Sequence, residues 1–134
     1  MTEPQFITWQ EIIIIHEISI ARFGGSPGMR DEHLIHSALG AAMNDFYYAA
    51  ADLAGIAAAY AFHIAQAQAF LDGNKRTAVG AALVFLERSG VETRMEWGTA
   101  LYDAIHAVAE KRMDKPGLAA LIRLLTASGT QPQP

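Results

Sequence analysis

Residues 70–77 read FLDGNKRT, and they join two alanine-rich stretches that both have helical patterns. Gly73 stands directly before the second of these helices, which we expect to run from about Asn74 to Ser89. The first backbone N–H groups of a helix have no partner within it, and the helix dipole gives this end a partial positive charge. The helix start at Asn74 is therefore a candidate anion site.

Two cations lie in the first turn of this helix. A positive charge at Lys75 or Arg76 opposes the dipole, unless a polyanion lies between these side chains and the helix amides. Arg offers a two-pronged contact to phosphate and Lys a point charge, and Asp72 is placed to hold a Mg²⁺ ion that bridges phosphates. The alternative is a capped helix with two solvated cations, and spacing alone leaves both interpretations open.

Composition favours an all-α fold. The chain has 134 residues, the usual size of one domain, and we expect a single domain over residues 1–134. Hydrophobic residues make up 51% of the chain and alanine occupies 25 positions, so the sequence can build a core and favours helix over strand. We predict a bundle of about six helices with at most a short strand or flap.

Caps and turn residues give the expected helix boundaries. Thr8 and Glu11 have the capping-box spacing, which predicts a helix to about Phe23 in spite of four consecutive isoleucines that favour strand. Asp31 and Asp114 are expected to cap two further helices. The remaining helices are expected over 52–67, 74–89 and 99–110.

The sequence also predicts the structure of three segments outside these helices. Residues 44–48 are interpreted as a turn followed by a covered aromatic loop. Residues 91–95 alternate weakly and are expected to form a short strand. Residues 128–134 are expected to be a frayed tail.

Charge and composition exclude several functional classes. Ten Lys and Arg against fourteen Asp and Glu give a net charge of −4, which argues against a nucleic-acid polymer as partner. The chain has no cysteine, so disulfides and thiolate metal sites are excluded, and no His and carboxylate spacing predicts a transition-metal site. Without a secretory signal or a long apolar run, we expect a cytoplasmic protein and no membrane partner.

The motif at residues 72–77, preceded by Phe70, resembles the signature of the Fic/Doc (Fido) superfamily. The lysine that follows Asn74 is characteristic of the death-on-curing (Doc) branch. Residues 24–31 (GGSPGMRD) and 81–87 (AALVFLE) also resemble that branch, so the resemblance covers nearly the whole chain. It implies the Fido-type helical bundle.

The resemblance also implies an activity and the residues that carry it. Members of this superfamily transfer part of a nucleotide to a protein hydroxyl, either adenylate or, in the Doc branch, the terminal phosphate of ATP. The resemblance assigns Mg²⁺ to Asp72, and the phosphates of ATP to Gly73, Asn74, Lys75 and Arg76. A translation factor as target and an antitoxin as partner are further expectations of the resemblance.

The family's general base is missing from its expected position. The family motif has His-Pro-Phe where residues 68–70 read Gln-Ala-Phe, and it commonly has Arg-Asn-His-Pro where residues 66–69 read Gln-Ala-Gln-Ala. The amide of Gln68 can hold a hydroxyl by a hydrogen bond but has no usable basicity near pH 7. General-base assistance is commonly worth about 10²–10⁴ in rate.

Other histidines are candidates to replace the missing base. His63 lies five residues before Gln68, which places it about 140° round the same helix. His33 and His36 lie on the second helix and could approach the site in space. His16 and His106 are interpreted as structural residues of amphipathic helices.

Two functions therefore compete. The first is a Doc-like transferase whose activity is impaired by Gln68, since phosphoryl transfer depends mainly on positioning and charge stabilisation. The second is a pseudoenzyme that acts as a binding or regulatory protein. A partner surface formed by residues 12–15 or 46–48 is a further possibility, with core packing as the default interpretation.

Overall fold

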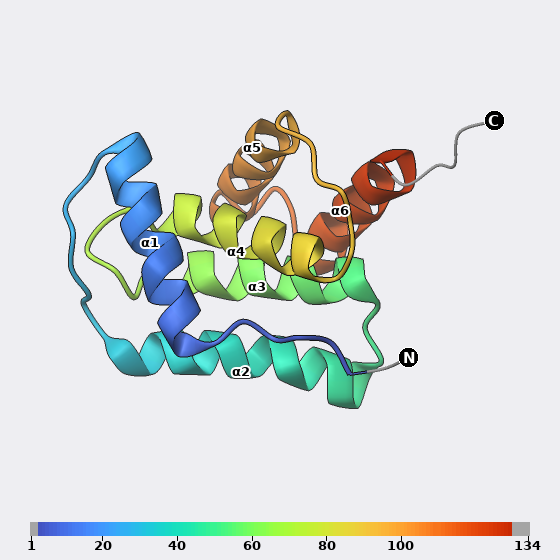
Figure 1. Cartoon of the computed structure of the whole chain (residues 1–134), viewed down its shortest axis with the longest axis horizontal. Coiled ribbons are helices and arrows are strands. Elements are labelled where there is room, and N and C mark those ends of the chain that lie inside the picture. Colours follow the sequence, from blue (N-terminus) through green and yellow to red (C-terminus); the bar gives the residue numbers. More distant parts are fainter. Residues whose placement is uncertain (1–2, 130–134) are drawn as a thin grey trace.

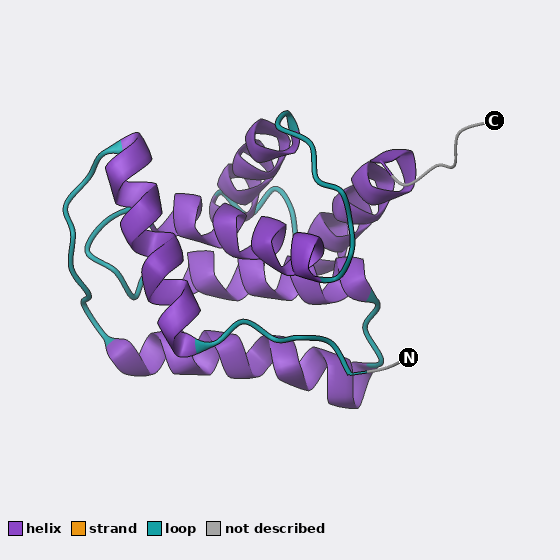
Figure 2. Ribbon diagram, viewed as in Figure 1, coloured by secondary structure: helices purple, strands orange, loops and turns teal. Residues whose placement is uncertain are grey.

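The computed structural model describes residues 3–129, and this part of the chain forms six α-helices (Figures 1 and 2). The prediction of an all-α bundle is confirmed. The helices are α1 (Trp9–Phe23), α2 (Glu32–Ala49), α3 (Leu53–Ala67), α4 (Asn74–Arg88), α5 (Trp97–Ala109) and α6 (Lys115–Gly129).

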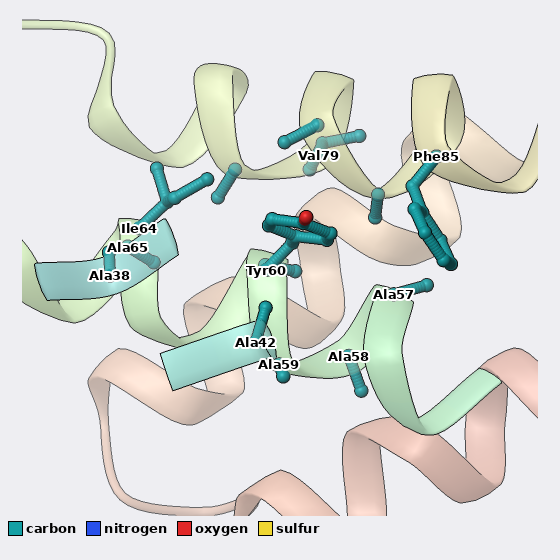
Figure 3. Packing of buried hydrophobic residues seen from close by; sticks show 14 of the residues in the cluster. Ala38, Ala42, Ala57, Ala58, Ala59, Tyr60, Ile64, Ala65, Val79 and Phe85 are labelled. Atoms are coloured by element: carbon teal, nitrogen blue, oxygen red, sulfur yellow. The ribbon is translucent and has the colours of Figure 1, made fainter. Parts of the chain in front are cut away.

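Helix α3 is the central element of the bundle. It packs against α4 along its length, with α2 on one side and α6 on the other, and α1 crosses α4 (Figure 1). Alanines at contact positions let the helices approach closely, as where Ala42 of α2 lies beside Ala59 of α3 (Figure 3). Tyr60 and Phe85 fill the space between α3 and α4, with ring centroids 5.4 Å apart.

The N-terminal helix is fixed at its start and packs closely on α4. The capping box is confirmed, because Thr8 Oγ1 accepts from the Glu11 N–H while the Glu11 carboxylate accepts from the Thr8 N–H. Glu11 also pairs with Arg88 at the end of α4. Where the two helices cross, a Cβ added at Gly80 would lie 2.8 Å from Ile15 Cγ2, so glycine permits the close approach.

Two local predictions were wrong. Residues 44–48 belong to α2, which continues to Ala49, and the side chain of Tyr48 is 86% exposed rather than covered. The packing of Phe46 on Phe6 outweighs the turn preference of Asn44 and Asp45 and the low helix propensity of this segment. Residues 91–95 form no strand, because within the described residues no extended segment lies beside them to pair with.

The fold brings two connections together at one end of the bundle (Figure 1). Met29 in the α1–α2 connection forms an isolated antiparallel bridge with Phe70 in the α3–α4 connection. The Arg30 and Asp31 N–H groups donate to the Ala69 carbonyl, and the Leu71 N–H donates to the Gly28 carbonyl. These bonds align residues 24–31 with the start of α4.

The frayed tail expected at residues 128–134 is tested only in part. Residues 128 and 129 belong to α6, and residues 130–134 of the expected tail lie outside the described part of the chain. No helix among residues 3–129 has the length and apolar character needed to cross a membrane.

Candidate functional site

The N-terminus of α4 is open to a ligand. Gly73 precedes the helix with φ +75°, in the left-handed region that glycine adopts without strain, and no side chain caps this end. The first helical bond runs from the Thr77 N–H to the Gly73 carbonyl, 2.9 Å apart. The amides of the first turn are therefore left for an anion or water.

A hollow of about 380 Å³ lies over this helix start. It contains every site residue predicted from the sequence, together with Phe23 and Tyr102. Its lining comes from the end of α1, the α3–α4 connection, the first turn of α4 and α5: Phe23, Gly24, Gln68, Leu71, Asp72, Gly73, Asn74, Lys75, Arg76 and Tyr102.

The two cations of the first turn have no acidic partner within the described chain. No carboxylate of residues 3–129 lies within 4.0 Å of the side-chain nitrogens of Lys75 or Arg76. The guanidinium carbon of Arg76 instead lies 4.0 Å from the ring centroid of Phe23 and 3.7 Å from that of Tyr102. Both contacts are cation–π interactions, which hold the arginine at the hollow and leave its charge unneutralised.

The carboxylate of Asp72 is held by two backbone amides. Its Oδ1 accepts from the Gly73 N–H at 2.9 Å, and its Oδ2 accepts from the Ser26 N–H at 3.2 Å. A Cβ added at Gly25 would lie 2.8 Å from Oδ2, so the α1–α2 connection packs directly against this carboxylate.

Asp72 can hold Mg²⁺ only in company with a ligand. Within the described residues, no group of three or more His, Cys, Asp or Glu side chains could hold a metal ion. Mg²⁺ commonly binds through one or two carboxylates, substrate phosphates and water rather than in an all-protein cage. A single carboxylate beside an open helix N-terminus fits an ion that arrives with a polyphosphate.

The side chain of Asn74 supports the loop. Its Oδ1 accepts from the Phe70 N–H and its Nδ2 donates to the Phe70 carbonyl, both at 3.0 Å, and the side chain is buried. Both polar groups of the amide are thus used within the protein. Asn74 can still offer its backbone N–H to an anion.

Gln68 lines the hollow and is the C-terminal capping residue of α3. It adopts φ +52°, and its side-chain Nε2 donates to the Ala65 carbonyl at 2.9 Å. The guanidinium of Arg30 donates to the Gln68 carbonyl, so the backbone here is also held. The residue at this position caps a helix and provides no base.

None of the five histidines lines the hollow. His63 Nε2 lies 3.2 Å from Lys115 Nζ on α6, and burial together with this neighbouring charge lowers the pKa of His63. His36 stacks on Trp9, and His33 is exposed on α2. His16 does not line the hollow either, but it contacts a residue that does, since its Nε2 lies 2.9 Å from the Asp72 carbonyl oxygen.

Comparison with known proteins identifies the family. The sequence model of the Fic/DOC family matches residues 6–86. The chain belongs to the Fic/DOC family. It is also 38% identical over 87 residues to the "Protein kinase doc" of Escherichia phage P1, a match that covers 64% of this chain and 69% of that protein. This relative supports the death-on-curing branch of the Fic/DOC family.

Several residues around the Fic/DOC motif were not predicted as parts of the site. Ser26 and Gly25 lie in the turn cluster after α1, and the resemblance assigned them no part in the site. His16 was interpreted as structural, and an i, i+3, i+4 pattern cannot say which loop a buried histidine meets. Phe23 and Tyr102 carry no motif, and only the packing of α1, α4 and α5 brings them to Arg76.

Proposed function

We propose that the hollow binds the phosphates of ATP together with Mg²⁺, and that the protein transfers a phosphoryl or nucleotidyl group to a protein hydroxyl at a reduced rate. This proposal rests mainly on the open N-terminus of α4, beside which Lys75 and Arg76 have no acidic partner among residues 3–129. Two unneutralised cations at the positive end of a helix are costly unless a polyanion joins them.

Each residue then has a definite part in binding. The amides of the first turn and Lys75 would neutralise phosphate charge, and Arg76 would offer two parallel donors to one phosphate. Asp72 would hold the Mg²⁺, whose chemistry is to offset negative charge on the phosphates. Phosphoryl transfer relies mainly on such positioning and charge, so loss of a base lowers the rate without removing the site.

The alternative is a pseudoenzyme, and the position of Gln68 favours it. The side-chain amide is occupied by the Ala65 carbonyl, and no histidine lines the hollow to replace a base. A protein of this kind would bind nucleotide, or a protein partner, without catalysis.

Protein partners are also part of the proposal. A translation factor is a candidate target and an antitoxin a candidate regulator, both inferred from the family. The run of isoleucines on α1 leaves Ile14 54% exposed, while Ile12 and Ile15 are buried. A groove of about 610 Å³ between α1 and α4 adjoins this face and supports the docking of a partner segment.

The test is transfer of label from ATP to protein in a bacterial lysate, with the label at the γ or the α phosphate. The native chain is compared with Gln68→His, which restores an imidazole and can keep the left-handed backbone. We expect Mg²⁺-dependent labelling that is at least tenfold faster in Gln68→His and is lost in Arg76→Ala.

Each outcome of this experiment has a distinct meaning. Labelling with ATP that carries the label at the γ phosphate, but not with ATP labelled at the α phosphate, identifies phosphoryl transfer. The reverse result identifies nucleotidyl transfer. Labelling only in Gln68→His favours the pseudoenzyme, and none in either protein contradicts the transferase. The further change Ala69→Pro is kept as a separate variant. Proline favours an extended backbone for the residue before it, whereas position 68 has a left-handed backbone.

A further inference from the structure

His16 contacts the two ends of the loop that precedes α4. Its Nε2 lies 2.9 Å from the Asp72 carbonyl oxygen, and its ring stacks on Phe70 with centroids 3.8 Å apart and planes 7° apart. The side chain is 4% exposed. One imidazole on α1 therefore holds both the aromatic start and the acidic end of the loop.

The bond to Asp72 fixes the orientation of one peptide group. A carbonyl oxygen accepts hydrogen bonds, so Nε2 of His16 carries the hydrogen. The same peptide group ends in the Gly73 N–H, which donates to Asp72 Oδ1 at 2.9 Å. His16 thus holds the carbonyl side of the plane, and the Asp72 carboxylate holds its amide side.

The orientation of this peptide group decides where the site's functional groups point. It sets the left-handed backbone of Gly73, from which α4 starts, and the direction of the Asp72 carboxylate. Glycine also permits the close packing here, since a Cβ at Gly73 would lie 2.9 Å from Ile20 Cδ1 and 3.6 Å from His16 Nε2. Without the His16 donor on α1, the Asp72 carbonyl would lose this hydrogen bond.

We propose that His16 is a positioning residue of the phosphate site: it fixes the Asp72–Gly73 peptide group so that the Asp72 carboxylate and the first-turn amides of α4 converge on the same ligand. This inference rests on the proposed function for its effect on nucleotide binding. Its effect on the loop does not depend on any ligand. His16 acts through Asp72 and Gly73 and touches no reacting group.

Two variants separate the hydrogen bond from the packing. His16→Phe keeps a ring to stack on Phe70 and removes the donor. His16→Gln keeps a donor that can reach the Asp72 carbonyl and removes the stacked ring. His33→Phe makes the same change at an exposed histidine of α2 and serves as the control.

The first measurement uses the protein without ligand. The ¹⁵N chemical shift and heteronuclear NOE of Gly73 report the order of its peptide group, and those of α3 report the core. We expect His16→Phe to lower the Gly73 NOE below that of α3, with His16→Gln and His33→Phe close to native. A native Gly73 signal in His16→Phe overturns the inference. If the Phe variant does not fold, His16→Met provides the donor-free side chain.

The second measurement is calorimetric titration with ATP in the presence of Mg²⁺. We expect His16→Phe to weaken binding at least tenfold and His16→Gln less than threefold, at protein concentrations where all variants are folded. Equal weakening in both variants, in step with their melting temperatures, overturns the positioning role. If the native chain binds no ATP, the proposed function fails, and the Gly73 signal alone decides the inference.

Discussion

Gly25 shows how a residue without a side chain controls the site. Its backbone φ of +115° is strained for any other residue, and a Cβ there would lie 2.8 Å from Asp72 Oδ2. The Asp72 carboxylate would have to move away from the Ser26 N–H that now holds it.

Replacement of Gly25 by alanine is expected to weaken ATP binding in Mg²⁺ at least tenfold, because the displaced carboxylate no longer faces the helix start. Gly90→Ala is the matched control, since Gly90 has φ +91° and nothing within 4 Å of an added Cβ. Both variants carry about 1–2 kcal/mol of backbone strain, and the contact with Asp72 is added only in the Gly25 variant, so its melting temperature should fall at least as far as that of the control. Equal ATP affinity in the two variants would contradict this role of Gly25, and calorimetry decides.

At the residue scale the sequence predicts candidate phosphate-binding residues but not the residues that support them. Gly73, Lys75 and Arg76 could be predicted because a glycine, a helix start and two misplaced cations form a local pattern. Asn74 was predicted as a phosphate ligand, but its amide braces Phe70, which depends on the path of the loop. The contacts of Arg76 with Phe23 and Tyr102 depend on packing across separate helices, which local spacing does not encode.

Helix α1 starts with a capping box, and its last residue, Phe23, lines the hollow. Its capping residue Glu11 pairs with Arg88 at the far end of α4, and mainly this hydrogen bond lowers the Glu11 pKa from 4.5 to about 2. The pair therefore ties the start of α1 to the end of the helix whose N-terminus forms the hollow.

The lowered pKa predicts how stability depends on pH. Folding favours ionised Glu11, so this contribution is complete above about pH 4.5 and is lost as the pH falls toward 2. Glu11→Gln keeps a capping-box acceptor but removes the titrating group. Between pH 5 and 3, the free energy of unfolding should fall less in Glu11→Gln than in the native chain, as measured by urea denaturation.

Glu110→Gln is the control for this prediction. Glu110 also pairs with an arginine, Arg112, but both side chains are exposed, so the pair contributes little. The Glu110 variant should follow the native pH dependence. If Glu11→Gln follows it as well, the pair between α1 and α4 does not contribute the expected stability.

Element type was predictable where periodicity and caps agreed. The caps predicted at Thr8, Asp31 and Asp114 were all confirmed, since each side chain accepts a bond from a first-turn amide. The end of α2 was not predictable, because the packing of Phe46 on the N-terminal segment carries the helix past Asn44 and Asp45. A strand at 91–95 depended on a partner strand that the described fold does not supply.

Residues 3–129 form a helical scaffold that presents the uncapped start of α4 to the hollow. The alanine-rich core lets α3 and α4 pack closely, and the two connections at their end bring Ser26, Gln68 and Asp72 together. The net charge of −4 hides this feature, since it averages over fourteen acidic residues, and none of them, all within the described part of the chain, lies within 4.0 Å of the side-chain nitrogens of Lys75 or Arg76. A single nucleotide is compatible with such a charge distribution.

A phosphate site at the start of α4 is tested most directly by calorimetric titration of the native chain with ATP in Mg²⁺, beside Arg76→Ala and Arg112→Ala. Both variants remove one exposed or half-exposed arginine, but only Arg76 lines the hollow. We predict saturable binding of one ATP per chain, weakened about 10- to 100-fold by Arg76→Ala, as expected for a charged hydrogen bond, and unchanged by Arg112→Ala. Absence of binding at millimolar ATP, or equal weakening by both variants, would contradict a phosphate site at the start of α4.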